Sequence, residues 1–400
     1  MLSSAWKYVP GNEYCVKVTD GTHDSPRQAE YGKPLITSKH IKGDVIDFDT
    51  AYLISEHDFN EINKRSKVDQ WDVIISMIGA YCGFCFIESS EEIDYAVKNV
   101  GLFKAGSEVN AKWLYYYLNS PIGRAHLDAV KSGSTQPYIA LGALRNLPIL
   151  VPKKEEVKEK IVAILDAIDT KIRVNNRINA ELEAMAKTLY DYWFVQFDFP
   201  DANGNPYKTS GGKMVYNPTL KREIPEGWSD DTLGEIAELY QPKTISEKEM
   251  TEDGEFLVYG ANGIVGRYDQ YNHEQSVVAV TCRGNSCGEI NVTRPYSWIT
   301  GNAMVVNTDS HFLPPTYIYN VLRSSGLENV ITGSAQPQIT RTNLAPMKII
   351  RPAEKVLTNY AEFVKPSFEK RMAILDENEK LEKLRDWLLP MLMNGQVTVK

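Results

Sequence analysis

Cysteine and long apolar runs are scarce in this sequence, and each scarcity excludes a class of protein. Five cysteines among 400 residues are too few and too odd in number for a disulfide framework, so we expect a reducing compartment. No apolar run approaches the ~20 residues that a membrane-spanning helix needs. The opening stretch MLSSAWKYVPGNEYC has no basic region followed by an apolar one, so no signal peptide is predicted. We therefore expect a cytoplasmic protein.

A basic excess is also missing. The chain has 44 Lys and Arg against 52 Asp and Glu, a formal net charge of −8. Free-standing DNA-binding proteins usually show the opposite balance, because contacts between basic side chains and phosphates supply much of their affinity. The charge by itself favours a ligand other than DNA. A DNA-binding role would require local clustering of the basic residues, or partners that supply part of the phosphate contact.

Catalytic motifs are absent as well. The sequence contains no GxxxxGK[ST] phosphate loop and no HExxH motif. It also lacks the glycine-rich cofactor loop and the Asn-Pro-Pro-aromatic site that a DNA methyltransferase needs. A stand-alone enzyme is therefore the least favoured reading, and we predict no catalytic residue and no cofactor in this chain.

Two cysteine pairs suggest a zinc site as one hypothesis. Cys82 and Cys85 form a CxxC, and Cys282 and Cys287 form a second pair, so four thiols are available for zinc. However, the pairs lie in different halves of the chain, and each is set in an apolar or strand-like run. This setting favours buried structural cysteines, and no metal site is predicted.

The strongest feature present is an internal repeat. GSTQP at 133–137 returns as GSAQP at 333–337, and the offset of 200 persists at Ile139/Ile339, Leu144/Leu344, Ile149/Ile349 and Pro152/Pro352. These are eight identities in twenty ungapped positions, where chance gives one or two. GSxQP has the composition of a turn, and two similar domains could each use the same turn. The repeat is real under this reading as well.

Each repeat is followed by an apolar strand-like stretch and then by a long charged helix. From about Lys153 to Phe194, nine of twelve heptad core positions are apolar, which is typical of a coiled coil. A second run, from about Ala353 to Asn394, has the same heptad, although Pro366 should kink it. Forty helical residues extend roughly 60 Å. Either the helices form a two-helix spacer, or each packs on its own globular domain. Each helix has one narrow apolar stripe, and the two stripes have matching register, which favours the spacer.

The predicted fold class is α+β: two mixed α/β domains separated by two long antiparallel coiled-coil helices, with a pseudo-twofold internal repeat. The residues predicted to form the helix-pair or partner interface are Ile161, Ile168, Ile178, Leu182, Leu189, Phe363, Leu381, Leu384 and Leu388. The predicted parts are a globular domain at 1–152, a helix at 153–197, a linker at 198–225, a second globular domain at 226–352 and a C-terminal helix at 353–400.

The globular domains are not close copies of each other, which suggests two different ligands on one frame. Their loops offer polar side chains suited to base edges, since Arg and Lys can contact guanine while Asn and Gln can contact adenine. The candidates for DNA contact are Thr22, His23, Lys39, Gln136, Tyr259, Asn262, Arg267, Arg283, Asn285 and Gln336. Polar residues beside glycines are also common turn formers, so this alternative stays open for each of them.

Several motifs resemble the specificity subunits of type I restriction–modification systems. In the globular domains these are VTDGTHDSP (18–26), PLITSKHIKG (34–43), IDFDTAYLISEHDFNEINKRSKV (46–68), LVYGANGIVGRYD (257–269) and VTCRGNSCGEI (280–290). LYDYWF (189–194) is similar to the central conserved region of that family, and IPEGW (224–228) and both GSxQP segments also fit. The resemblance covers nearly the whole chain.

The resemblance implies a non-catalytic DNA-reading subunit. Each globular domain would be a target-recognition domain for one half of a split, asymmetric DNA sequence. The helices would set the spacer and dock two modification (methyltransferase) subunits, and restriction (translocase) subunits would complete the complex. S-adenosylmethionine, ATP and Mg would be held by those partners. An orphan modification system without a nuclease and a two-domain protein-binding scaffold with no DNA role remain as alternatives.

Overall fold

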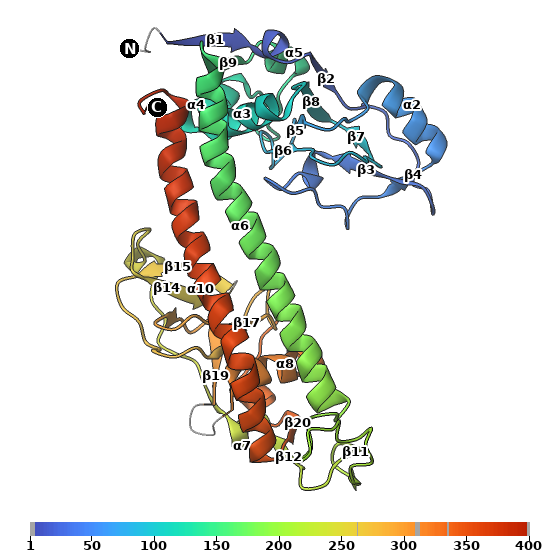
Figure 1. Ribbon diagram of the computed structural model, residues 1–400, viewed down its shortest axis with the longest axis vertical. Coiled ribbons are helices and arrows are strands. Elements are labelled where there is room, and N and C mark those ends of the chain that lie inside the picture. The colour runs from blue at the N-terminus through green and yellow to red at the C-terminus, as the bar shows by residue number, and fades with distance from the viewer. Residues whose placement is uncertain (1–4, 262, 309–312, 334–335, 398–400) are drawn as a thin grey trace. The chain divides into compact units, whose positions relative to one another are not determined.

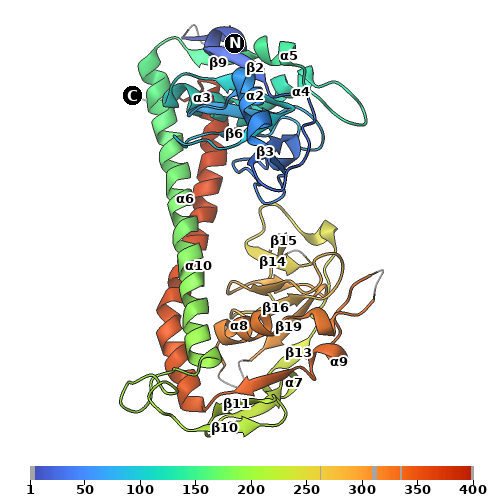
Figure 2. The same cartoon turned by 90° about the vertical axis from the view of Figure 1, so that its right-hand side faces the viewer.

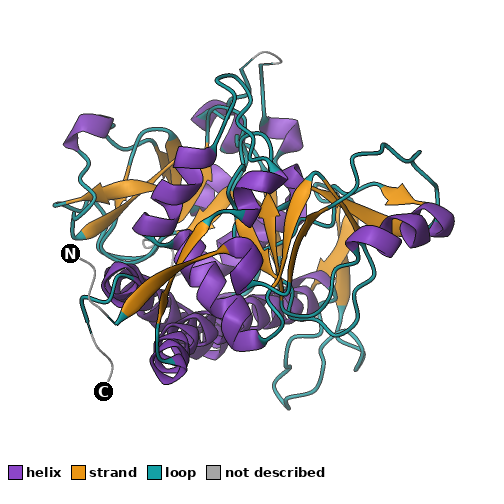
Figure 3. Ribbon diagram, turned by 90° about the horizontal axis from the view of Figure 1, so that it is seen from above, coloured by secondary structure: helices purple, strands orange, loops and turns teal. Residues whose placement is uncertain are grey.

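The computed structural model describes residues 5–261, 263–308, 313–333 and 336–397. The chain divides into two compact units: unit 1 is Met1–Val174 with Asn378–Lys400, and unit 2 is Asn175–Glu377. Each unit contains both helices and strands, which confirms the predicted mixed composition. Figure 3 shows helices in purple and strands in orange. Because each unit draws on separate stretches of sequence, the linear domain boundaries stay predictions. The two units are described one at a time.

Unit 1 contains nine strands among its described residues (Figure 1). They are β1 (Trp6–Pro10), β2 (Lys17–Asp20), β3 (Lys33–Thr37), β4 (Leu53–Ile54), β5 (Asp72–Ser76), β6 (Cys85–Ile87), β7 (Ala96–Lys98), β8 (Val100–Lys104) and β9 (Pro148–Pro152). Its helices are α1 (Gly11–Tyr14), the 3₁₀ turn η1 (Ser38–His40), α2 (Glu56–Ser66), α3 (Glu108–Asn119), α4 (Pro121–Val130) and α5 (Leu141–Arg145).

The core of unit 1 forms around a four-stranded antiparallel sheet in the order β2-β8-β5-β6. Every residue of the central strand β5, DVIIS, is buried, so the apolar run needs no alternation. Trp113 of α3 is fully buried and donates its indole N–H to the Leu150 carbonyl oxygen of β9 at 3.0 Å. This bond satisfies a polar group that would be costly to bury alone.

A buried ion pair lies at the edge of this core. Asp72 of β5 is paired across the sheet with Lys104 of β8, and it also accepts the Asp69 backbone N–H at 2.7 Å. Burial is the largest influence on Asp72 and raises the pKa of its carboxyl to about 6, although Lys104 acts in the opposite direction. The carboxyl therefore holds a proton in the folded state at a pH where the unfolded chain has released it.

We expect Asp72→Asn to remove one pH dependence of unfolding. A folded pKa above the unfolded value adds stability that is complete below the unfolded pKa of 3.8 and is lost as pH rises through about 6. The wild type should thus gain on the order of 2–3 kcal/mol relative to the variant between pH 7 and pH 4. Denaturant unfolding of both proteins at several pH values measures this. Parallel curves would contradict the assignment.

Unit 2 contains eleven strands among its described residues. Figure 2 labels several of them. They are β10 (Met214–Asn217), β11 (Arg222–Pro225), β12 (Ser229–Thr232), β13 (Glu238–Tyr240), β14 (Phe256–Gly260), β15 (Gly263–Tyr268), β16 (Val278–Thr281), β17 (Ile290–Val292), β18 (Trp298–Ile299), β19 (Ala303–Asn307) and β20 (Lys348–Arg351). Its shorter helices are the π turn η2 (Asp191–Val195), α7 (Leu233–Ile236), η3 (Glu247–Glu249), α8 (Pro315–Ser325), η5 (Glu328–Val330) and α9 (Arg341–Leu344).

The sheets of unit 2 have counterparts in unit 1. The four-stranded order β13-β19-β16-β17 matches β2-β8-β5-β6, and the three-stranded order β15-β14-β18 matches β4-β3-β7. In both three-stranded sheets the central strand pairs parallel with one neighbour and antiparallel with the other. β12 pairs antiparallel with β20 as β1 pairs with β9. Two divergent sequences therefore support the same strand order.

The predicted helices are present as α6 (Glu155–Tyr190) and α10 (Glu354–Met393), and α10 continues through Pro366. Glu155 and Glu156 occupy the first turn of α6, where negative charge suits the helix dipole. Gly395, with φ of 73°, follows the end of α10 in the left-handed conformation of a helix stop. That these helices form a coiled coil stays a prediction.

The two helices contact each other within each unit. In unit 1, Arg385 of α10 donates to Asp169 of α6 at 3.2 Å. In unit 2, Asn175 donates to Glu377 at 2.9 Å, and Arg371 donates to Glu183 at 2.8 Å. From the first of these unit 2 contacts to the second, the residue number rises along α6 and falls along α10. The helix segments in that unit therefore run antiparallel.

The nine predicted interface residues differ in exposure. Ile161 and Ile168 are buried, and Ile178, Leu182, Leu189, Leu381 and Leu388 are half-buried. Phe363 and Leu384 are exposed, at 66% and 42%. Val364 and Leu389 are buried one residue after Phe363 and Leu388, and the other buried residues of α10 include Leu357, Tyr360, Ile374, Asn378 and Leu392.

Candidate nucleic-acid interface

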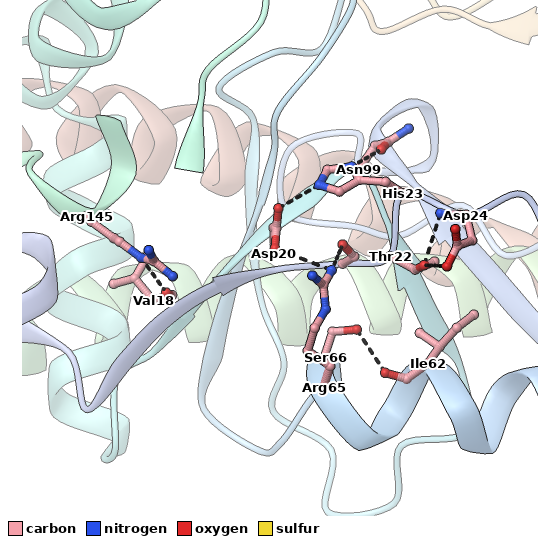
Figure 4. Close-up of polar contacts among 11 residues, drawn as sticks. Val18, Asp20, Thr22, His23, Asp24, Ile62, Arg65, Ser66, Asn99 and Arg145 are labelled. Carbon is pink, nitrogen blue, oxygen red and sulfur yellow. Dashed lines mark hydrogen bonds and ion pairs between the residues drawn. The ribbon is translucent and has the colours of Figure 1, made fainter. Parts of the chain in front are cut away.

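The loop after β2 holds His23 by both ring nitrogens. Nε2 lies 2.9 Å from the carboxylate of buried Asp20, and Nδ1 lies 3.0 Å from the side-chain oxygen of Asn99 (Figure 4). Arg65 of α2 approaches Asp20 at 3.5 Å and donates to the Gly21 carbonyl oxygen at 2.8 Å. The His23 side chain is 64% exposed, so a fixed polar ring is presented to solvent.

Thr22 is buried and shapes this loop. Its backbone N–H bonds to the Val97 carbonyl oxygen at 3.0 Å, and its hydroxyl accepts the Asp24 backbone N–H at 3.1 Å. The side chain is therefore used in a turn, as the alternative reading of polar loop residues predicted. Thr22 positions His23 and does not reach solvent itself.

Lys39 is exposed on η1, and Asn99 connects this turn to the His23 loop. The Ser38 hydroxyl donates to the Asn99 carbonyl oxygen at 2.6 Å, while the Asn99 backbone N–H donates to the Thr22 carbonyl oxygen at 3.2 Å. Asn99 has a φ of 54°, a left-handed conformation that Asn tolerates. Asn99 was not among the residues predicted from the sequence, and its position between two short strands was the available signal.

Gln136 is exposed beside a glycine-rich loop between β5 and β6, which we call the Gly79 loop (residues 77–84). The Gly79 N–H donates to the Pro137 carbonyl oxygen at 2.9 Å, and the Ile139 N–H donates to the Met77 carbonyl oxygen at 2.9 Å. The Met77 N–H donates in turn to the Ser38 hydroxyl at 3.1 Å. Unit 1 thus connects the loops of His23, Lys39 and Gln136 by hydrogen bonds.

Arg283 and Asn285 lie exposed on the corresponding loop of unit 2, the Gly284 loop (residues 282–289) between β16 and β17. The Gly284 N–H donates to the Pro337 carbonyl oxygen at 3.3 Å, and the Ile339 N–H donates to the Cys282 carbonyl oxygen at 3.0 Å. Gln336 is exposed next to Pro337. The structure therefore brings the loops of three predicted residues of unit 2 together.

Two other candidates of unit 2 have side chains that are engaged within the fold. Tyr259 of β14 is buried, and its hydroxyl accepts the Arg294 backbone N–H at 3.1 Å; burial raises the pKa of this phenol. Arg267 of β15 donates to the carbonyl oxygens of Gly254 and Glu255. Both side chains stabilise the local fold. Asn262 lies outside the described residues.

All five cysteines are free thiols. Cys82, Cys85 and Cys282 are buried, and burial raises the pKa of Cys85 to about 11. A thiol with a raised pKa is a poor nucleophile and a poor metal ligand at neutral pH. Within the described ranges, no group of three His, Cys, Asp or Glu residues is arranged to hold a metal ion.

Among the residues that the structure describes, no helix combines the length and apolar character needed to cross a membrane.

Comparison with known proteins gives a consistent result. The family model for the type I restriction modification DNA specificity domain matches residues 15–184 and 225–382. The type I restriction enzyme MjaIX specificity subunit of Methanocaldococcus jannaschii is 26% identical over 313 residues, which cover 73% of this chain and 70% of that protein. The HindI specificity subunit of Haemophilus influenzae is 20% identical over 338 residues, covering 67% of this chain and 73% of that protein.

A solved structure is similar in fold. The crystal structure of a type I restriction–modification system S subunit from M. genitalium matches with a TM-score of 0.58 and 16% identity, covering 97% of this chain and 96% of that one. At this identity the match supports the fold alone.

Proposed function

Because the chain belongs to the family of type I restriction–modification DNA specificity domains, with one match in each half, we propose that it is the DNA specificity subunit of such a complex. Each globular domain reads one half of a split, asymmetric DNA site. The observation that carries the proposal is the double match itself, over residues 15–184 and 225–382. The two matched regions have the same strand order and carry different exposed side chains.

The long helices α6 and α10 have a separate role in this proposal. They set the spacing between the half-sites and dock two modification (methyltransferase) subunits, and restriction subunits join the complete complex. The chain itself performs no catalytic step. S-adenosylmethionine belongs to the modification partners, and ATP and Mg belong to the restriction partners.

An exchange of one globular domain tests the proposal. Residues 226–352 are replaced by the corresponding domain of another family member, and a matched variant replaces residues 1–152. We expect each exchange to change one half-site and to leave the other half-site and the gap as they were. The measurement is selection from a random duplex library by the full chain with its modification subunits, followed by sequencing.

The same experiment separates the main alternative. A protein-binding scaffold with no DNA role would enrich no split sequence in the wild-type selection. A change of both half-sites in either exchange would show that the domains do not read independently. Either result would overturn the proposed function.

A further inference from the structure

The Gly79 and Gly284 loops have the same backbone, although they come from different halves of the chain. Gly79 and Gly284 have φ values of 83° and 85°, and the last glycines of the loops, Gly83 and Gly288, have 95° and 98°. Such values are strained for any residue with a Cβ, so glycine fixes the path at both ends. The glycines of the GSxQP segments, at 133 and 333, agree as well, with 86° each.

Several backbone hydrogen bonds of the two loops also correspond. Within the loops, the Cys82 and Cys287 N–H groups donate to the carbonyl oxygens of Gly79 and Gly284, each at 3.0 Å. At the loop ends, the Gly83 and Gly288 N–H groups donate to Ser76 and Thr281 at 2.8 and 2.9 Å. The bonds to the two GSxQP segments, described above, complete the match. Each GSxQP segment therefore holds its loop by backbone contacts that are independent of the loop's side chains.

The side chains on this common backbone are different. Where the Gly79 loop has Ile78, Ala80 and Tyr81, the Gly284 loop has Arg283, Asn285 and Ser286. Ala80, Arg283 and Asn285 are exposed, as are the later pair Phe84 and Glu289. Ile78, Tyr81 and Ser286 are half-buried, and the Ser286 hydroxyl donates to the Ala261 carbonyl oxygen. A rigid backbone with variable exposed side chains is what a recognition element requires, because affinity for one base can change without a change in fold.

Resting on the proposed function, we propose that these two loops are the base-reading elements of the two domains. The specificity-determining residues are Ile78, Ala80 and Tyr81 in unit 1 and Arg283, Asn285 and Ser286 in unit 2. The GSxQP segments act as positioning elements.

The chemistry predicts what each loop reads. Arg283 can donate two hydrogen bonds to guanine, and Asn285 can pair with adenine in the major groove. The Gly79 loop offers no such donor pair. Its Tyr81 and Phe84 rings pack edge to face at 5.6 Å, and the Arg124 guanidinium lies 5.7 Å from the Phe84 centroid. Apolar contact of this kind suits the thymine methyl group.

The His23 loop is a weaker candidate for the same role. The open recess of about 620 Å³ beside it is bordered by Arg65 and by the carboxyls of Asp24, Asp58 and Glu61, and Lys64 pairs with Glu61. The carboxyls of Asp24 and Asp58 disfavour close approach of phosphates. His23 is also held by Asp20 and Asn99, so its ring nitrogens are engaged.

Exchange of side chains between the loops tests the inference in one chain. One variant carries Ile78→Arg, Ala80→Asn and Tyr81→Ser; the reciprocal variant carries Arg283→Ile, Asn285→Ala and Ser286→Tyr. Each full chain, with its modification subunits, selects from a random duplex library. We expect each variant to change base preference in one half-site only, by about 5- to 150-fold at the affected position. The untouched half-site serves as the internal control.

A single substitution guards against misfolding of the triple variants. Arg283 is exposed, so Arg283→Ala should leave thermal unfolding unchanged and still lose a comparable fold-preference at one base pair. Lys208→Ala is the matched control, because Lys208 is an exposed cation of unit 2 that lies outside both loops, and it should leave base preference intact. If the wild type selects a split site and none of the loop variants changes it, the inference is overturned and the proposed function stands. If the wild type selects no split site, the proposed function fails with it.

Discussion

Replacing Phe194 with Ala is expected to destabilise unit 2 by about 3–5 kcal/mol, the usual loss for a fully enclosed aromatic side chain. Phe194 is 3% exposed and lies at the centre of an aromatic cluster at the end of α6. Its ring is 4.8 Å from that of Tyr317 and 4.9 Å from that of Tyr360, both edge to face, and 5.9 Å from Trp228. The substitution therefore removes packing with α8, with α10 and with Trp228, the residue before β12, at once.

Calorimetry or denaturant unfolding of the full chain measures this loss. Tyr192→Ala is the matched control, because Tyr192 belongs to the same π-helical turn but is 37% exposed. Its removal should cost well under half as much. Equal losses would show that the turn, and not the buried cluster, limits the stability of unit 2.

The π turn explains why this cluster was only partly predictable. The sequence predicted one regular helix from about Lys153 to Phe194. The π-helical turn η2 covers Asp191–Val195 and leaves Trp193 and Phe194 buried. Residues 198–225, predicted as a linker, also pack here: Phe199 stacks on Trp228 at 5.0 Å. The composition of this segment predicted its turns, but it did not predict that the aromatic side chains between the turns pack in the core.

The second helix shows a related limit. Its existence and ends follow from local signals, namely the heptad, the preceding proline and the Asn-Gly stop. Its buried face does not follow from these local signals, because a straight helix drifts about 20° per heptad from a strict seven-residue repeat. In addition, polar Asn378 occupies a buried position. The structure accordingly buries Val364 and leaves Phe363, a predicted interface residue, exposed.

The candidate interface was predictable to the level of loops. Composition identified the loops of His23, Lys39, Gln136 and Arg283, because glycine, asparagine and proline mark turns locally. The contacts that connect those loops are separated by long stretches of sequence, such as the 76 residues between His23 and Asn99. A single sequence carries no local signal for such pairs, so Asn99 and Arg124 appear only in the structure.

Shortening both long helices by one heptad is expected to have the largest functional effect. The variant lacks residues 171–177 of α6 and 376–382 of α10, and the ion pairs Asp169–Arg385 and Glu183–Arg371 on either side of the deletions remain available. Seven residues correspond to roughly 10 Å of helix, or about three base pairs of rise. Under the proposed spacer role, the original DNA site should lose about 1,000-fold or more of its affinity, which approaches non-specific binding.

The loss of affinity should come from the altered spacing between the half-sites, and not from an altered base preference. Seven residues make nearly two full helical turns, so the deletions keep each helix face within about 20° of its former direction. Both half-site sequences should therefore reappear in a random-library selection, separated by a different number of base pairs. Arg173→Ala with Arg177→Ala controls for lost surface charge, because these exposed residues fall within the deleted segment and their substitution leaves the helix length unchanged. An unchanged gap in the shortened protein would show that the helices do not set the spacing, even if both domains read DNA.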